Sequence, residues 1–166
     1  TLDRSSAASD VYKRQDEKAA LAKAHGCVHT INYNKENFVE RVKEITGGKG
    51  VPVVYDSIGK DTFTGSLDCL SPLGMMVSFG GASGPVPPFS LNELASRGSL
   101  FVTRPSLFNY IAKRDDLEMM AAELFGMVES GKIKIDINQR YALKDVAQAH
   151  RDLESRKTTG STILLP

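Results

Sequence analysis

Two stretches of the sequence combine small residues with groups that suit a phosphorylated ligand, and each directly follows an apolar run. Asp56-Ser-Ile-Gly59 comes after Val51-Pro-Val-Val-Tyr55, and Phe79-Gly-Gly81 comes after Met75-Met-Val-Ser78. Glycine has no Cβ, so a ligand can approach its backbone closely. Apolar runs of this kind predict a parallel sheet covered by helices, in which ligands bind beyond the carboxyl ends of the strands. The two stretches therefore predict a shared nucleotide pocket.

Asp56 and Ser78 lie at or next to the ends of the two predicted strands and are the first candidates for acid–base or nucleophilic chemistry. We interpret Asp56 as a turn or helix-capping residue, because an aspartate at such a position commonly accepts hydrogen bonds from its own backbone. Ser78 lacks the GxSxG elbow that an α/β hydrolase uses, so hydrolase chemistry has no support.

The histidines and cysteines do not form a metal or redox motif. His25, His29 and His150 have no acidic or cysteine neighbours at ligand spacing, and Cys27 and Cys69 form no CxxC pair. The sequence therefore predicts neither a metal site nor a disulfide scaffold.

The 166 residues suffice for one domain of ordinary size, and a hydrophobic content of 41% predicts a packed core. Lys and Arg number 21 against 20 Asp and Glu, which gives a formal net charge of +1. The charges are dispersed, so neither a nucleic acid nor a membrane surface is expected as a partner. No apolar run approaches the roughly 20 residues that span a bilayer. A cytoplasmic location is the expectation.

The order of the predicted elements indicates the fold class. Helices are predicted over 16–25, 35–46, 61–70 and 91–97, and strands over 28–33, 51–56, 75–79 and 100–103. We expect Asn34 to cap the second helix, and Pro72 and Gly74 to separate the third helix from the strand that follows. This alternation predicts an α/β fold with a Rossmann-like, doubly wound parallel sheet.

The alternation loosens near 105–108, where we place a domain boundary. Beyond it we predict a helix over about 115–130, a strand over 132–137, a helix over 144–155 and a strand over 161–165.

Residues 1–15 show neither helical nor strand periodicity, and we interpret them as a non-native or poorly ordered leader. The GxGxxG fingerprint of dinucleotide-binding folds is absent before the first predicted helix. The sheet is therefore expected to be truncated at its N-terminal side.

Five motifs then occur in a specific order and spacing: Ile31-Asn-Tyr33, Val53-Val-Tyr-Asp-Ser-Ile-Gly59, Gly74-Met-Met-Val-Ser-Phe-Gly80, Phe101-Val-Thr-Arg-Pro-Ser106, and Glu154-Ser-Arg156 followed by Gly160-Ser161. In this pattern the chain resembles the C-terminal half of the NADPH-dependent quinone oxidoreductases, in the zinc-free branch of the medium-chain dehydrogenase/reductases. The resemblance covers residues 16–166. It assigns 16–106 to a partial NADPH-binding domain and 107–166 to a segment that packs toward an absent GroES-like catalytic domain.

The resemblance implies hydride transfer from NADPH to a quinone or similar electron-poor acceptor, without a metal. It also implies a homodimer formed through the edge strand 100–103. The apolar residues of 107–166 would be partly uncovered without the catalytic domain, which would make this segment the least stable region.

The resemblance also implies a set of cofactor-binding residues. Lys18 and Tyr33 match residues near the adenosine 2′-phosphate, and Arg156 matches an arginine that closes over the cofactor. The remaining matches lie along the ribose and nicotinamide: Ser57, Gly59, Phe79, Gly80, Gly81, Arg104 and Pro105. Taken alone, the charged residues read equally well as a solvated lysine, a surface ion pair and a helix C-terminal cation.

Two alternatives remain open. One is a relative with the same fold, such as an enoyl-thioester reductase or a zinc-dependent alcohol dehydrogenase. The other is a catalytically inert nucleotide-binding or assembly module, because the loop that normally seats the pyrophosphate is missing.

Overall fold

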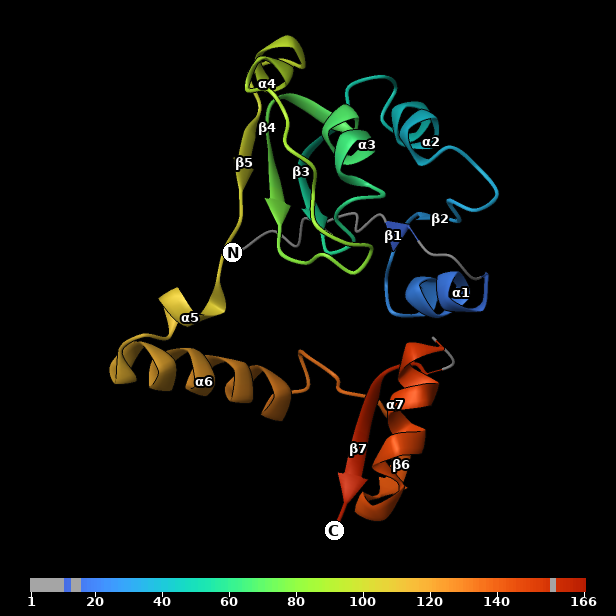
Figure 1. The fold of residues 1–166 in the computed structure, drawn as a ribbon, viewed down its shortest axis with the longest axis vertical. Coiled ribbons are helices and arrows are strands. Elements are labelled where there is room, and N and C mark those ends of the chain that lie inside the picture. The colour runs from blue at the N-terminus through green and yellow to red at the C-terminus, as the bar shows by residue number, and fades with distance from the viewer. Residues whose placement is uncertain (1–10, 13–15, 156–157) are drawn as a thin grey trace. The chain divides into compact units, whose positions relative to one another are not determined.

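The computed structural model describes residues 11–12, 16–155 and 158–166. The chain divides into two compact units, Thr1–Leu107 and Phe108–Pro166 (Figure 1).

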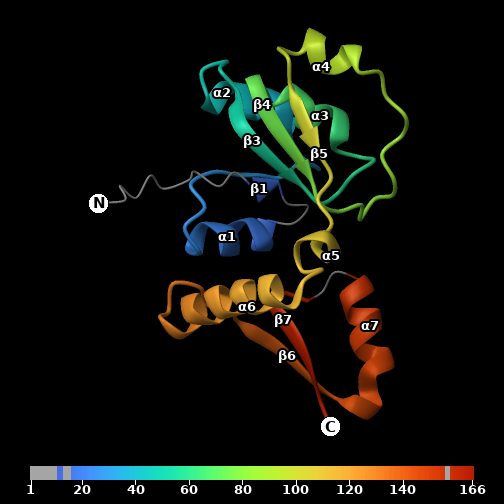
Figure 2. The ribbon, with the colours of Figure 1, turned by 90° about the vertical axis from the view of Figure 1, so that its left-hand side faces the viewer.

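The first unit is built around a parallel sheet of three strands in the order β3, β4, β5. These strands are Val51–Asp56, Leu70–Ser78 and Phe101–Thr103. They lie side by side in Figures 1 and 2, with α2 and α3 alongside. The predicted parallel α/β arrangement is confirmed, and β3 has the predicted bounds.

Helices α2 (Phe38–Ile45) and α3 (Phe63–Asp68) contribute to the core of this unit. The core is a cluster of buried side chains that come from the strands of the sheet, from these helices and the residues beside them, and from the segment before α2: Ile31, Val42, Val54, Phe63, Leu67, Cys69, Leu70, Met76 and Leu100. Burial of this apolar surface is the main force that holds the helices to the sheet.

The cap of α2 was wrongly predicted. Asn37, not Asn34, accepts hydrogen bonds from the N–H groups of Val39 and Glu40 at 3.0 and 3.4 Å. The N–H of Asn34 instead donates to Oδ1 of Asn32, which forms a turn before the helix. The side chain of Asn32 thus accepts in the turn, and the side chain of Asn37 caps the helix. Helix α2 consequently starts three residues later than predicted.

The opposite side of the sheet is exposed in the described residues. Val53, Met75 and Phe101 are paired across the three strands, and their exposed fractions are 42%, 40% and 55%. Tyr55, one pleat further along β3, is 70% exposed. The apolar composition of β3 and β4 predicts helices on both faces, yet the described helices α2 and α3 cover only one.

The break predicted between α3 and β4 was wrong. Strand β4 begins at Leu70 and contains both Pro72 and Gly74. Leu70 pairs with Val51 whereas Met75 pairs with Val53, so the residues between Leu70 and Met75 bulge from the ladder. A bulge accommodates proline in a strand because the residue there need not donate to the ladder.

The N-terminal part of the unit contains strand β1 (Val11–Tyr12), helix α1 (Asp16–Ala24) and strand β2 (Thr30–Ile31). We predicted no strand before α1, and this was wrong: Val11 and Tyr12 pair in parallel with Thr30 and Ile31. Two residues are too few to show an alternating pattern. Strand β2 is also shorter than the predicted 28–33.

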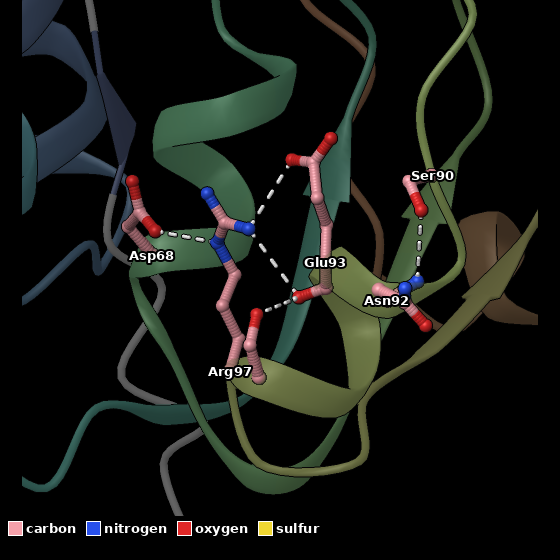
Figure 3. A network of polar contacts seen from close by, with 6 residues as sticks. Asp68, Ser90, Asn92, Glu93 and Arg97 are labelled. Atoms are coloured by element: carbon pink, nitrogen blue, oxygen red, sulfur yellow. Dashed lines mark hydrogen bonds and ion pairs between the residues drawn. The ribbon is translucent and has the colours of Figure 1, made fainter.

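Helix α4 (Asn92–Ser96) is fastened by Arg97 (Figure 3). Nε of Arg97 donates to Asp68 at the end of α3 at 2.7 Å, and Nη1 donates to the carboxylate of Glu93 at 3.2 Å. This network fixes the far end of the loop that follows β4.

The second unit contains α6 (Arg114–Glu129), β6 (Ile137–Ala142), a 3₁₀ turn (Leu143–Asp145), α7 (Val146–Glu154) and β7 (Ser161–Leu165). Helix α5 (Leu107–Tyr110), which was not predicted, joins the units. Strand β7 has its predicted bounds, but the strand predicted over 132–137 was wrong. Pairing begins only at Ile137, which lies opposite Ser161, the first residue of β7.

Candidate functional site

The carboxyl ends of β3 and β4 meet at one edge of the sheet, as predicted from the sequence. Asp56 pairs with Ser78 at the last position of the ladder. One residue further on, the N–H of Phe79 donates to the carbonyl of Asp56 at 2.9 Å. The turn 57–61 and the loop 79–84 therefore leave the sheet together, and we call these two segments the strand-end loops.

Asp56 organises the turn 57–61 from inside the protein, where its side chain is 1% exposed. Oδ1 accepts hydrogen bonds from the N–H groups of Ile58 and Gly59 at 2.8 and 2.9 Å. Oδ2 accepts from the hydroxyls of Thr62 and Ser66 at 2.7 and 2.8 Å. Four donors satisfy this buried carboxylate, and the prediction that Asp56 serves a turn is confirmed.

Gly59 and Gly80 allow the strand-end loops to touch. A Cβ on Gly80 would lie 2.4 Å from the carbonyl oxygen of Ser57. Gly59 has φ +89°, and a Cβ there would lie 2.7 Å from the carbonyl oxygen of Gly84. We expected Ser57 and Gly59 to let a ligand approach, whereas the contacts in the structure are between the loops themselves. A Cβ on Gly81 would meet only an ordinary contact, at 3.5 Å.

Backbone hydrogen bonds also join the strand-end loops. Three cross from one to the other: Ala82 N–H to the Ser57 carbonyl at 3.1 Å, Ser83 N–H to the Ile58 carbonyl at 2.8 Å, and Lys60 N–H to the Gly84 carbonyl at 3.2 Å. The two strand-end loops consequently form one continuous surface at the edge of the sheet, which we call the ledge.

Arg104 follows β5 and reaches the same ledge. Its Nη1 donates to the carbonyls of Ser78 and Gly80 at 2.8 and 3.1 Å. The guanidinium thus places a permanent positive charge against the start of the loop 79–84. Pro105, the next residue, is partly buried.

Phe79 lies on this ledge with its ring 53% exposed. The ring stands edge-on to Tyr55, with 6.4 Å between the ring centroids. The structure therefore gathers most of the predicted cofactor residues at one edge: Ser57, Gly59, Phe79, Gly80, Gly81 and Arg104.

A second candidate region lies between α1 and the segment after β2. A pocket of about 320 Å³ is lined by residues of both: Ala19, Ala20, Lys23, Thr30, Asn32, Lys35 and Glu36. Two lysines and one glutamate give its lining a positive balance. Lys23 and Lys35 were missed, although helical spacing could have found Lys23, one turn after Ala19 and Ala20.

Three predicted residues belong near α1 or to the C-terminal segment. Lys18 belongs to α1, and only its backbone is described. Tyr33 directly follows the pocket residue Asn32 and is partly buried. Arg156 lies outside the described residues.

Comparison with known proteins identifies the class. The family model described as zinc-binding dehydrogenase matches residues 25–164. The chain belongs to this family.

Within the family, the chain is similar to quinone oxidoreductases, as the sequence motifs indicated. It is 56% identical over 150 residues to "Quinone oxidoreductase" of Pseudomonas aeruginosa, covering 90% of this chain and 46% of that protein. It is 48% identical over 152 residues to "2-haloacrylate reductase" of Burkholderia sp, covering 91% and 46%. The chain spans about half the length of the curated relatives it matches.

Solved structures confirm the Rossmann-like α/β fold. The structure of Escherichia coli quinone oxidoreductase complexed with NADPH matches with a TM-score of 0.89 and 50% identity. The match covers 95% of this chain and 49% of that chain.

The description of the family names zinc, whose sites need several His, Cys, Asp or Glu side chains close together. Across 16–155 and 158–166, no three His, Cys, Asp or Glu side chains gather where they could hold a metal ion. Structural and catalytic zinc sites take three or four such ligands. The described residues do not fit a zinc ion.

Proposed function

We propose that this chain is the NADPH-binding part of an oxidoreductase that transfers a hydride to a quinone or a similar electron-poor acceptor, without a metal. The observation that carries the proposal is the edge of the sheet where the ends of β3, β4 and β5 deliver the strand-end loops and Arg104. Parallel sheets bind nucleotides at this kind of edge. The relatives named quinone oxidoreductase, one of them solved with NADPH, support it.

The nicotinamide end of the cofactor is proposed to lie along Ser57, Gly59, Phe79, Gly80 and Gly81. When bound, NADPH supplies the hydride, and the chain binds and orients it. Arg104 and Pro105 close this side of the site, and the guanidinium charge favours the anionic cofactor.

The adenosine 2′-phosphate is proposed to bind beside α1 and β2. Lys18 and Tyr33 are the proposed contacts, and Lys23 and Lys35 add positive charge in the neighbouring pocket. A phosphate dianion is favoured by ammonium groups and by the N-terminus of a helix. Arg156 is proposed to close over the cofactor.

Several features of the whole protein belong to the same proposal. Residues 107–166 would pack toward a catalytic domain, and two copies would associate through β5. This strand is an edge of the described sheet, and an edge strand offers backbone N–H and C=O groups with which a second strand can pair. We propose a cytoplasmic location. No helix in the described residues is both long and apolar enough to span a membrane.

A second candidate function is reduction of an activated carbon–carbon double bond, as in an enoyl reductase. It is favoured by the 48% identity to the protein named 2-haloacrylate reductase. Both candidates use the same cofactor and differ only in the acceptor. An inert nucleotide-binding module is the third possibility that the same assays address.

Titration of the chain with NADPH and NADH tests the proposal. We expect NADPH to bind more tightly, and Lys18→Ala to remove most of the difference, because a charge-assisted contact contributes about 1–3 kcal/mol. Glu36→Gln is the matched control, since it alters the charge near the pocket without removing a cation. Equal affinities for both cofactors, unchanged by Lys18→Ala, would contradict the assignment.

Turnover is measured separately, as oxidation of NADPH by a quinone and by an enoyl thioester. The chain alone is expected to be weak or inactive, since it spans about half the length of the quinone oxidoreductases that it matches. Turnover at the level of an intact enzyme would refute that expectation, and the preferred acceptor separates the two reductase functions.

A further inference from the structure

One side chain, Ser83, joins the strand-end loops in addition to their backbone contacts. Its hydroxyl donates to the carbonyl of Ile58 at 2.8 Å. The same oxygen accepts a hydrogen bond from the N–H of Asp61 at 3.0 Å. The backbone N–H of Ser83 also donates to Ile58, at 2.8 Å. Three hydrogen bonds therefore run from this residue to a turn more than 20 positions earlier in the chain.

The partner that Ser83 holds is itself rigid. The N–H groups of Ile58 and Gly59 are both bonded to Oδ1 of Asp56, which is buried and also bonded to Thr62. The buried carboxylate of Asp56 thus fixes the backbone of the turn 57–61. Ser83 ties its own loop to this fixed turn.

The contact of Ser83 with the turn 57–61 also restrains the residues that precede Ser83 in the loop 79–84. The ladder between β3 and β4 ends at the pair of Asp56 and Ser78, and one residue beyond it the N–H of Phe79 still donates to the carbonyl of Asp56. The residues proposed to face the nicotinamide, Phe79 to Gly81, lie between that last pair and Ser83. They are consequently held by the sheet and by Arg104 on one side, and by Ser83 together with the backbone of Ala82 on the other.

We propose that Ser83 is a positioning residue for nucleotide binding, which couples the loop 79–84 to the turn 57–61 so that both present one preformed surface. The inference rests on the proposed function, because it assigns that surface to the nicotinamide end of NADPH. A preformed surface lowers the conformational entropy that binding must otherwise remove. Ser83 itself need not touch the cofactor.

Three variants of the full chain test this role. Ser83→Ala removes both hydroxyl contacts, and Ser83→Thr keeps the hydroxyl. Ser90→Ala is the matched control, because the hydroxyl of Ser90 accepts a hydrogen bond from Asn92 N–H at the other end of the same loop, away from the turn (Figure 3). For each chain we would measure amide hydrogen exchange without ligand, and the affinities for NADPH and for adenosine 2′,5′-bisphosphate, which lacks the nicotinamide.

Ser83→Ala is expected to speed exchange at the amides of Asp61 and Lys60 by roughly fivefold or more, as the loss of one typical hydrogen bond would. It should weaken NADPH by a similar factor and leave adenosine 2′,5′-bisphosphate unchanged. Ser83→Thr should restore both properties. Ser90→Ala should alter neither, although it removes a hydroxyl from the same loop.

Two results would overturn the inference. If Ser83→Ala leaves the exchange of Asp61 and Lys60 unchanged, the loops are not coupled through Ser83. If exchange rises but NADPH binds as tightly as to the wild type, the coupling has no role in positioning. Failure of the proposed function looks different, because the wild type would then bind neither nucleotide, and the positioning role would fail with it.

Discussion

At the scale of single residues, Gly80 is a position in the strand-end loops where a methyl group should clash with the backbone. A Cβ there would lie 2.4 Å from the carbonyl oxygen and 2.7 Å from the Cα of Ser57, and both of these are backbone atoms that cannot rotate away. Gly80→Ala should therefore force the strand-end loops apart and destabilise the first unit by about 1–3 kcal/mol, the usual range for overpacking. Urea unfolding followed by circular dichroism would measure it.

Gly81→Ala is the control for this prediction. Its Cβ would come no closer than 3.5 Å to Gly84, so the same substitution one residue along adds no clash. A change of less than about 1 kcal/mol is expected, and a gain is as acceptable as a loss, since alanine restricts the unfolded chain. Equal losses at both glycines would mean that the loops are looser than the structure shows.

Cys69 should be chemically inert in the folded chain. Its side chain is fully buried, and this burial raises the pKa of the thiol to about 12. The reactive form is the thiolate, so a disulfide reagent at pH 8–10 should label Cys69 only after unfolding. The measurement uses Cys27→Ser, which leaves Cys69 as the single thiol. Labelling of the native chain as fast as in urea would contradict the burial.

The same shift predicts a pH dependence of stability. The unfolded thiol loses its proton near pH 9, whereas the folded thiol keeps it until about pH 12. The buried, protonated thiol therefore makes its full contribution to stability below pH 9. The free energy of unfolding should fall as the pH rises from 9 toward 12. Cys69→Ala should show a shallower fall over this range, and parallel curves for the two chains would refute the assignment.

At the scale of elements, Arg97 is the fastening point of α4. Its guanidinium joins Asp68 on α3 to Glu93 on α4, and the Arg97 side chain is only 24% exposed (Figure 3). Arg97→Lys should cost about 0.5–1.5 kcal/mol in thermal or urea unfolding, because an ammonium cannot reproduce a planar, forked contact.

Arg114→Lys gives the comparison for Arg97. Arg114 also pairs with a glutamate, Glu118, but both side chains are mostly exposed, at 78% and 60%. Exposed pairs contribute ~0–1 kcal/mol, so this change should be hardly measurable. If the two substitutions had the same small effect, the contacts of Arg97 would be no more than surface ion pairs.

Elements with a strong local pattern were predictable, and elements set by long-range pairing were not. The bounds of β3 and β7 were predicted correctly because each is a mostly apolar run with a glycine directly before it and a serine or proline directly after it. Strand β6 was misplaced because only its pairing with Ser161 decides where it starts. Pro72 was taken for a break because the bulge that tolerates it depends on the register with β3.

The candidate site shows the same division. Parallel strands with small residues at their ends predicted that Asp56 and Phe79 would lie at one edge, and they do. The contact between the loops was not predictable, because it joins Ser57 to Gly80 through backbone atoms that carry no sequence signal. The role of Ser83 was not predictable for the same reason, since a serine in a Gly/Pro-rich stretch has no distinguishing pattern.

At the scale of the whole molecule, the two units differ in how much they bury. The described residues of the first include a contiguous core of nine buried apolar residues. In the described part of Phe108–Pro166, Ala149 alone is buried. The prediction that apolar residues of this unit would be partly uncovered is confirmed, with Ile135 at 54% and Leu165 at 44% exposed.

This difference predicts that the second unit opens first. Without a buried core, local unfolding of α6 and of the pair β6 and β7 should need less free energy than unfolding of β3 and β4. A protease that cleaves after apolar residues should therefore cut the chain beyond residue 107 before it cuts within 51–78. Hydrogen exchange should rank the two regions in the same order.

NADPH sharpens the test, because a ligand stabilises only the part of the chain that binds it. If the cofactor binds at the strand-end loops, saturating NADPH should slow exchange in 51–84 and leave the ranking of the units unchanged. A second unit that resists proteolysis as well as β3 and β4 would show that it is stable on its own. The exposed apolar side chains of the second unit would then be an ordinary surface. They would no longer be an argument that a partner domain covers them.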